Sequence, residues 1–259
     1  MPETFFAWVG FILQKYGPLF LQGTGVTMTI AVSGTVIGFA IGLLVGIART
    51  LRPYSPAARA VLVPVKFLLG VYIEVFRGTP MIVQAMVINY GLIMFLGVGL
   101  PKMAVAIFIV SINTGAYMAE IVRGGVLSVD TGQTEAAHSI GMTHWQTMTN
   151  VVLPQAVRNI MPSIGNEFIV NIKDTSVLNV IAVSELFFMS KSAAGTYLRY
   201  FEVFFITGAI YLTLTFTVSR LLRLLERRMD GPANFTIHGS QSAAGAFISV
   251  RGEKTKQED

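Results

Sequence analysis

The longest uncharged segment of the chain constrains its fold more than any other feature. Residues 16–48 contain no Asp, Glu, Lys, Arg or His over 33 consecutive positions. A helix needs about 20 mainly apolar residues to cross the hydrocarbon core of a bilayer. The composition agrees, because 53% of the 259 residues are hydrophobic and only 13% are charged, whereas an ordinary soluble domain has about 25% charged residues. We therefore predict an integral membrane protein.

Cysteine and histidine usage excludes several chemical functions. The chain has no cysteine, which rules out disulfides, thiolate nucleophiles and iron–sulfur clusters. Its three histidines lack the spacing of a metal site, and it has no GxxxxGK[ST] motif for binding nucleotide phosphates. We expect no catalytic residue, metal or cofactor in this chain. The net charge of +5 is interpreted as a topology signal and not as a sign of nucleic-acid binding.

Charged residues divide the apolar sequence into about five predicted transmembrane helices. These are expected at residues 16–48, 78–101, 103–120, 159–184 and 202–220. Lys and Arg accumulate after the first, third and fifth helices, and basic loops stay in the cytoplasm. The N-terminus is therefore expected outside the cell and the C-terminus in the cytoplasm. The predicted fold is an all-α transmembrane domain over residues 1–228 with a polar, flexible cytoplasmic tail over residues 229–259.

Two further segments bear on how the helices pack. Residues 57–76 are apolar enough either to lie at the membrane interface or to form a helix that enters the bilayer. Within the first predicted span, glycine recurs at every fourth position, at Gly34, Gly38, Gly42 and Gly46. Small residues at this spacing line one helix face and let a neighbouring backbone approach closely. We therefore expect the first span to pack tightly against another helix.

The loop over residues 124–158 is polar and contains no apolar run of membrane length. Thr134 and the residues after it favour a helix start, and Thr143 to Gln146 has the pattern of a capping box that opens a second helix after Gly141. The loop is thus predicted to be a cytoplasmic pair of short helices. Such a pair either docks in a groove of a soluble partner or lies as an amphipathic hairpin on the membrane surface.

A motif with fixed spacing lies in this loop. It reads Glu135-Ala136-Ala137, three residues, Gly141, nine residues, then Val151, one residue, Leu153 and Pro154. The motif resembles the EAA signature of the permease subunits of ABC importers, with Val151 in place of the usual isoleucine. The resemblance implies that these residues couple the chain to a separate ATPase. We expect an outward-facing Glu135, supported by two alanines packed beneath it, to form a rigid knob.

Other segments resemble the polar amino-acid permeases of that family, so that the resemblance covers about residues 20–228. They are residues 74–80, 115–125, 132–133 and 173–176. The resemblance implies a bacterial inner-membrane permease that imports a polar amino acid by alternating access. It further implies two ATP-binding subunits, which hold ATP and Mg²⁺, an extracytoplasmic amino-acid-binding protein, and a second copy of the permease or a homologue.

Three ionisable residues interrupt the fourth predicted span, namely Glu167, Lys173 and Asp174. An ionisable side chain at the bilayer centre costs about 2.5–3.5 kcal/mol, so these side chains are expected to face a cavity or one another. Glu167, Asn171 and Asp174 are spaced i, i+4 and i+7, which places them on one stripe of a helix. Two carboxylates and an amide on one stripe suit a cationic amino acid. We also expect a helix break near Asp174, as transporter sites often use discontinuous helices.

We therefore predict a basic substrate, of the arginine, lysine or histidine type, bound by this stripe with Thr175, Ser176, Asn113 and Tyr117 as further contacts. Permeases that resemble importers of cationic amino acids carry an acidic residue seven positions before the counterpart of Asp174. Several alternatives stay open: Asp174 pairs with Lys173, Asn113 and Tyr117 join helices, or the substrate is glutamine or another polar amino acid. From other classes, the alternatives are an ATP-independent secondary transporter or channel and a membrane enzyme.

Overall fold

The computed structural model describes residues 2–51, 55–97, 99–229, 235–238 and 247–250. The described chain is almost entirely helical, as predicted. Its elements in order are α1 (Phe5–Thr50), α2 (Pro56–Gly78), α3 (Met81–Leu96), α4 (Lys102–Leu127), α5 (Thr131–Ser139), α6 (His144–Thr147), the π-helix η1 (Met148–Val152), α7 (Leu153–Asp174), the 3₁₀-helix η2 (Thr175–Ile181), α8 (Leu186–Tyr197), α9 (Tyr200–Met229) and strands β1 (Phe235–His238) and β2 (Phe247–Val250).

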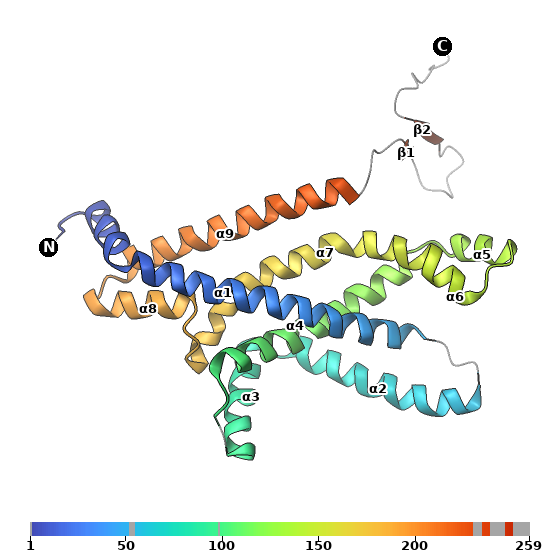
Figure 1. Ribbon diagram of the computed structural model, residues 1–259, viewed down its shortest axis with the longest axis horizontal. Helices are drawn as coiled ribbons and strands as arrows, with labels where there is room; N and C mark the ends of the chain where they lie inside the picture. The colour runs from blue at the N-terminus through green and yellow to red at the C-terminus, as the bar shows by residue number, and fades with distance from the viewer. Residues whose placement is uncertain (1, 52–54, 98, 230–234, 239–246, 251–259) are drawn as a thin grey trace, which may run out of the picture.

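The helices form an elongated bundle in which α1, α7 and α9 follow the long axis (Figure 1). Three described helices, α1, α4 and α9, are long and apolar enough to cross a membrane. The segment from His144 to Ile181 and helix α8, bent by 57° relative to each other, form a fourth candidate span. Helix α3 is apolar but shorter. The fold class is thus confirmed, and the five predicted crossings correspond to these four candidates and α3.

The second predicted span differs from the structure in its boundaries. The region expected at residues 78–101 contains α3 alone, and the apolar segment before it forms the separate helix α2. The two helices break at Thr79, which has extended backbone because it precedes Pro80. The side-chain amide of Gln84 bridges the break, donating to the carbonyls of Phe76 and Thr79, both at 2.9 Å.

The expected close packing of the first span is confirmed, and its partner is α4. A Cβ atom at Gly42 would lie 2.3 Å from Met118 Cβ and 2.8 Å from the backbone nitrogen of Ala119. A Cβ at Gly34, Gly38 or Gly46 would likewise come within 3 Å of an atom of α4. Glycine at every fourth position therefore lets the two backbones approach where any side chain would collide. We call this contact the α1–α4 seam.

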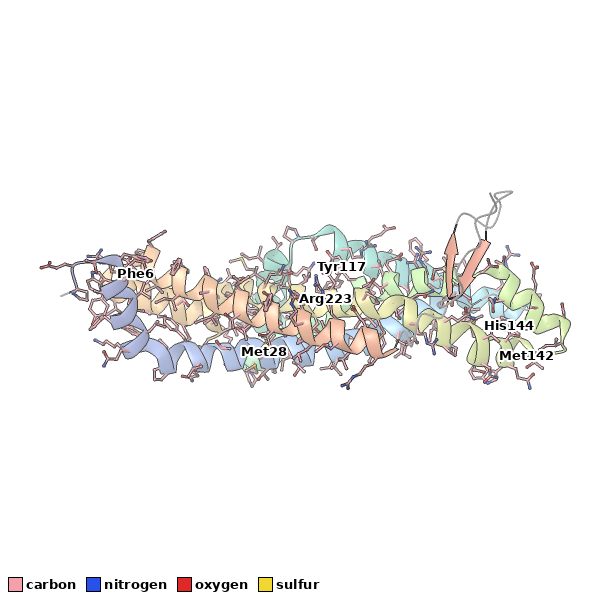
Figure 2. The ribbon with its side chains drawn as sticks, turned by 90° about the horizontal axis from the view of Figure 1, so that it is seen from above. Phe6, Met28, Tyr117, Met142, His144 and Arg223 are labelled. Carbon is pink, nitrogen blue, oxygen red and sulfur yellow. The ribbon has the colours of Figure 1, made fainter. Side chains whose placement is uncertain are left out.

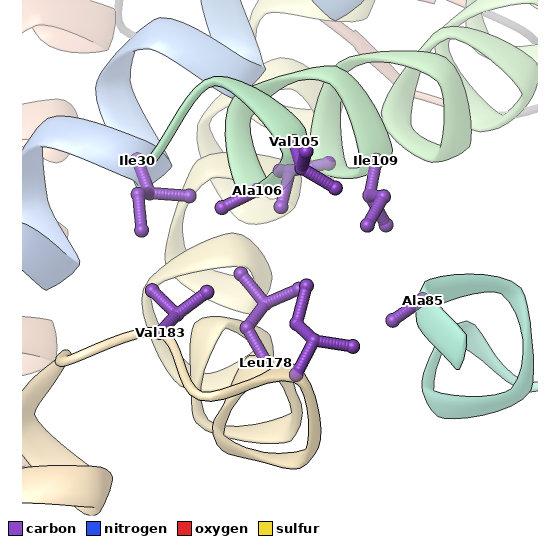
Figure 3. Packing of buried hydrophobic residues seen from close by; sticks show 9 residues of the cluster. Ile30, Ala85, Val105, Ala106, Ile109, Leu178 and Val183 are labelled. Atoms are coloured by element: carbon purple, nitrogen blue, oxygen red, sulfur yellow. The ribbon is translucent and has the colours of Figure 1, made fainter. Parts of the chain in front are cut away.

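The main apolar cluster lies beside the seam (Figure 3). Ile30 of α1 and Ile109 of α4 meet Leu178 of η2 and Ala85 of α3 there, all fully buried. A second cluster joins the first turns of α1 to α8 and α9 through Trp8, Phe20 and Leu186. The 3₁₀ segment η2 is thus held between α1, α3 and α4, which fixes the end of α7.

The polar tail was expected to be flexible over residues 229–259. Within it, the structure describes the backbone of β1 and β2, which pair antiparallel with Phe235 opposite Val250. Residues 230–234, 239–246 and 251–259 lie outside the described residues. That the tail is a flexible unit separate from the membrane domain therefore stays a prediction.

Candidate functional site

The loop predicted to be a pair of short helices consists of α5 and α6, which we call the coupling hairpin (residues 131–147). Asp130 caps α5, since its Oδ1 accepts from the backbone N–H of Gly132 at 2.6 Å. Gly141 has φ of +84°, a left-handed conformation that favours glycine. Thr143 and Gln146 form the predicted capping box at the start of α6. Both helices and the glycine turn between them are therefore confirmed, but α5 begins at Thr131 and not at the predicted Thr134, because Asp130 supplies the cap three residues earlier than expected.

The hairpin presents apolar and acidic side chains to its surroundings. Ile140 is 80% exposed and Trp145 is 74% exposed, and Glu135 is exposed as expected. Of the two alanines predicted to pack beneath Glu135, only Ala137 is buried, whereas Ala136 is exposed. Consecutive helical residues point about 100° apart, so a helix that packs by one narrow face buries only one of them.

The second helix of the hairpin continues into the membrane domain. A π-helix, η1, joins α6 to α7 without a break, and the N–H of Leu153 bonds to the carbonyl of Met148, five residues earlier. Pro154 follows, and a proline lacks an N–H and clashes with the carbonyl four residues before it. The wider π turn therefore accommodates Pro154 in a continuous helix. Leu153 and Pro154 of the sequence motif lie at this joint, and α7 begins there, six residues before the predicted start of the fourth span at residue 159. The motif does not predict the π turn.

The first part of α7, which follows the hairpin in the chain, is fixed to the end of α4. A Cβ atom at Gly125 would lie 2.1 Å from Ile160 Cγ2, so α4 and α7 are in close contact there. The side-chain amide of Asn159 donates to the hydroxyl of Ser128 at 2.9 Å. Further out, a cavity of about 160 Å³ separates the hairpin from α4, with the buried hydroxyl of Thr147 unpaired at its wall within the described chain. The firm connection of the hairpin therefore runs through α7.

Asn171, expected to bind substrate, lies between three helices. It is 3% exposed, its side-chain N–H donates to Thr35 Oγ1 at 2.8 Å, and its carbonyl oxygen accepts from Thr114 Oγ1 at 3.1 Å. Both threonines are also buried, one on α1 and one on α4. Asn171 thus joins α7 to the α1–α4 seam in this conformation, and its amide has no free group directed at a ligand.

The two predicted carboxylates on α7 have a different environment. Glu167 and Asp174 are half-buried, Asp174 repels Glu167 and attracts Lys173 electrostatically, and neither carboxylate has a hydrogen bond or ion pair within the described residues. Lys173, beside them in sequence, is exposed. The helix break predicted near Asp174 is not found, because Asp174 and Thr175 both keep right-handed helical backbone and α7 continues directly into the 3₁₀-helix η2 without a side-chain cap from Asp174. The bend of 57° lies further along the chain, between Ile181 and Leu186. Of the two hydroxyl residues after Asp174, Thr175 is buried and Ser176 is half-buried.

Asn113 and Tyr117, predicted as further contacts, both interact with the break between α2 and α3. Asn113 donates to Gln84 Oε1 at 2.9 Å and is buried. The Arg77 guanidinium carbon lies 5.5 Å from the centroid of the Tyr117 ring, within cation–π range. One turn further along α4, Glu120 pairs with Arg123 at 2.7 Å and with Arg49. In this structure Asn113 therefore joins α4 to α3, as the alternative interpretation of this residue expected.

Sequence reasoning did not identify Glu185, the most buried acidic residue that the structure describes. Its carboxylate accepts from the backbone N–H groups of Phe187 and Phe188 at 2.8 and 2.7 Å and from the hydroxyl of Tyr211 at 3.1 Å. It therefore caps α8 at the bend of the fourth candidate span. A lone acidic residue directly before an apolar run is a helix-start signal, which could have revealed this role.

Comparisons with known proteins agree with a helical membrane domain. Residues 56–231 match the family described as binding-protein-dependent transport system inner membrane component. The chain is 39% identical to the glutamine transport system permease protein GlnP of Escherichia coli (strain K12) over 213 residues, 82% of this chain and 93% of that protein. It is 31% identical to the arginine transport system permease protein ArtQ of Bacillus subtilis (strain 168) over 214 residues, with the same two shares.

A solved structure agrees as well. The crystal structure of an amino acid ABC transporter with histidines contains a chain 38% identical to this one, with a TM-score of 0.77 over 88% of this chain and 100% of that chain. The chain therefore belongs to the binding-protein-dependent transport system inner membrane component family. It is a multi-pass inner-membrane permease subunit of an amino-acid ABC importer, and its family works with ATPase subunits and binding proteins. The chain is not an enzyme, because separate ATPase subunits hydrolyse ATP.

Proposed function

We propose that this permease moves a basic amino acid across the membrane and that Glu167 and Asp174 attract its cationic group. The observation that carries the proposal is that both carboxylates lie half-buried on one side of a membrane helix without a hydrogen-bonding partner in the described chain. A carboxylate in such a place is costly unless a cation or water reaches it. A relative that transports arginine and a related structure with histidines support this choice. Glutamine is the second candidate, supported by the relative GlnP.

The remaining residues of the site have supporting roles in this proposal. Ser176, half-buried beside Asp174, and Tyr117 at the break between α2 and α3 contact the bound amino acid. Asn171, Thr175 and Asn113 reach it only when their present hydrogen bonds open. Alternating access supplies such a change, because the two states differ in helix packing.

The proposed assembly has two permease chains, each with the coupling hairpin seated on one of two ATPase subunits, which hold ATP and Mg²⁺. A binding protein delivers the amino acid at the opposite end, near the N-terminus and α8. This orientation puts the N-terminus outside and the end of α9 in the cytoplasm, where Arg220, Arg223 and Arg228 accumulate. In Figure 2, Met142 and His144 of the hairpin lie at one end of the bundle and Phe6 at the other.

Energy transfer in this proposal follows the helix that leaves the hairpin. ATP binding shifts the permease between two states only through contacts that differ between them. The exposed residues Glu135, Ile140 and Trp145 are such contacts, with Ala136, Ala137 and Gly141 setting the shape of the hairpin. Movement of the hairpin passes through η1 at Leu153 and Pro154 into α7, which carries both carboxylates.

Glu167→Gln tests the substrate class in the reconstituted complex with its ATPase subunits and binding protein. We expect ATP hydrolysis stimulated by arginine to require at least about tenfold more arginine-loaded binding protein, since a charged hydrogen bond contributes about 1.5–3 kcal/mol. Stimulation by glutamine should change little. The matched control is Glu74→Gln, which removes the same charge from an exposed position on α2.

Three results would contradict the proposal. Equal losses with arginine and glutamine would give Glu167 a role in folding. Stimulation of the native complex by glutamine and not by any basic amino acid would make glutamine the substrate. Uptake into vesicles that contain the permease alone, without ATP, would indicate a secondary transporter.

A further inference from the structure

One face of α9 carries a row of exposed side chains that changes from apolar to cationic along its length. Its apolar members are each more than half exposed, and its cationic members are exposed arginines. The row, which we call the α9 stripe, consists of Phe201, Phe205, Leu212, Phe216, Arg220 and Arg223. Successive members are four, seven, four, four and three residues apart, a spacing that keeps them on one side of a helix.

Beyond its first two members, the stripe faces away from the rest of the described chain. At its start, the rings of Phe201 and Phe205 contact the ring of Phe5 on α1, with centroids 5.5 and 5.3 Å apart. At the level of the arginines, another side of α9 packs against α7, where a Cβ at Gly165 would lie 3.1 Å from Leu222 Cδ1. Figure 2 shows Arg223 on α9 at the surface of the bundle, between Phe6 at one end and His144 at the other. This part of the stripe therefore lies on the outer surface of the membrane domain. Its arginines are at the end of the stripe that is nearer the coupling hairpin.

The two guanidinium groups have no anionic partner in the part of the chain that the structure describes. Neither Arg220 nor Arg223 takes part in an ion pair, although Glu226 lies one turn beyond. Arg220 instead extends back along the stripe, with its Cζ 4.8 Å from the centroid of the Phe216 ring. Each guanidinium carries five N–H donors, and an unpaired one beside the hydrocarbon region is costly.

We propose that Arg220 and Arg223 bind the phosphate of an anionic phospholipid whose acyl chains lie along the apolar part of the α9 stripe. A phosphate offers the acceptors that both guanidinium groups lack, in the bidentate geometry that arginine prefers. Basic clusters at the membrane surface attract anionic headgroups, and three aromatic rings and a leucine suit the chains below. The glycerophosphate and its chains thus match the charge and the apolarity of one continuous face.

The test compares binding of phosphatidylglycerol with that of phosphatidylcholine carrying the same acyl chains, using native mass spectrometry of the full-length chain. Loss of two arginine contacts should weaken phosphatidylglycerol binding about thirtyfold in the double variant R220Q/R223Q. The control R59Q/R228Q removes two exposed arginines that lie off the stripe and should keep most of the affinity. Leu212→Asn, which changes only the apolar part, should weaken binding of both lipids.

Several outcomes would overturn the proposal. One is a native chain that shows no preference for phosphatidylglycerol, and another is a control variant that loses as much affinity as R220Q/R223Q, which would mean unspecific charge attraction. Competition by millimolar inorganic phosphate equal to that of the lipid would make free phosphate the ligand. Conversion of a native dimer to monomers by R220Q/R223Q would assign the stripe to a second copy of the chain. None of these results bears on Glu167 or on the transported amino acid.

Discussion

The α1–α4 seam and the coupling hairpin are both essential parts of one permease, yet they are built on opposite principles. At the seam, glycines allow two backbones to touch, and a Cβ at any of four positions would come within 3 Å of an atom of α4. On the hairpin, a nine-residue helix and a four-residue helix expose Ile140 and Trp145 almost completely. The four glycine positions of the seam leave no room for an added carbon, whereas the hairpin leaves large apolar groups exposed in the part of the chain that the structure describes.

The contrast separates residues that hold the fold from residues that, in the proposed function, transmit the motion of the ATPase subunits. Lipid does not drive helices together by the hydrophobic effect, so close van der Waals contact and buried hydrogen bonds must do so. The seam supplies both, through its glycines and through Asn171 bonded to Thr35 and Thr114. The hairpin needs only a fixed shape of its own if, as we propose, an ATPase subunit covers its apolar surface. Changes at the seam should therefore affect folding, and changes on the hairpin should affect assembly.

Gly42→Val should have the largest effect. The added Cβ alone would lie 2.3 Å from Met118 Cβ and 2.8 Å from the Ala119 nitrogen, so α4 must move away along its length. Overpacking of this kind costs about 1–3 kcal/mol and more where the backbone is in the way. We expect most of the protein to aggregate or unfold during extraction, measured by fluorescence-detected size-exclusion chromatography with a heating step.

Gly25→Val is the matched control for this experiment. Gly25 lies on the same helix, and a Cβ there would meet no atom within 4 Å. It should leave the elution profile and the melting temperature close to those of the native chain. If both valine variants behaved alike, helix propensity and not the seam would account for the result.

Trp145→Ala should leave the permease folded and weaken its association with the ATPase subunit by about tenfold or more, as expected for truncating an aromatic anchor at the centre of an interface. The affinity between purified subunits measures this change. Phe6→Ala serves as the control, because Phe6 is 80% exposed but lies at the opposite end of the molecule. Unchanged affinity in Trp145→Ala, or a loss of thermal stability equal to that of Gly42→Val, would contradict the distinction between the two regions.

Asn171→Leu should produce a smaller effect at the seam. It removes two hydrogen bonds and leaves the hydroxyls of Thr35 and Thr114 without their partner, at a cost of about 1 kcal/mol inside a membrane protein. The free energy of unfolding in a denaturing detergent titration measures it, and Asn166→Leu at an exposed position of α7 is the control. A double-mutant cycle with Thr35→Val that shows no coupling would mean that the Asn171–Thr35 bond does not stabilise the seam.

The same two regions show which features were predictable from the sequence. The hairpin is determined by local chemistry: Gly141 provides the left-handed turn, and Thr143 and Gln146 cap each other across three residues. The seam was predictable only in part, because the glycine repeat indicates that α1 packs closely against another helix but does not indicate which helix that is. Asn171 meets residues 57 and 136 positions away, and no local pattern specifies such contacts. For the same reason Glu167, Asn171 and Asp174 on α7 were predicted to act as one binding stripe, whereas the structure directs the Asn171 amide inward and leaves both carboxylates without a hydrogen bond or ion pair in the described residues.

Thr143→Ala, a change on the coupling hairpin, should have the smallest effect of these substitutions. It tests whether the hairpin unfolds independently of the seam. The Thr143 hydroxyl accepts from the backbone N–H of Gln146 at 3.3 Å, while Gln146 Oε1 accepts from the backbone N–H of Thr143 at 2.9 Å. Loss of an exposed cap costs about 0.5 kcal/mol, so amide exchange over residues 143–147 should become about twofold faster. Thr149→Ala is the control, since that hydroxyl donates only to carbonyls. Faster exchange at the seam in Thr143→Ala would show that the hairpin and the seam unfold as one unit, because a purely local cap leaves the packing of α1 on α4 intact.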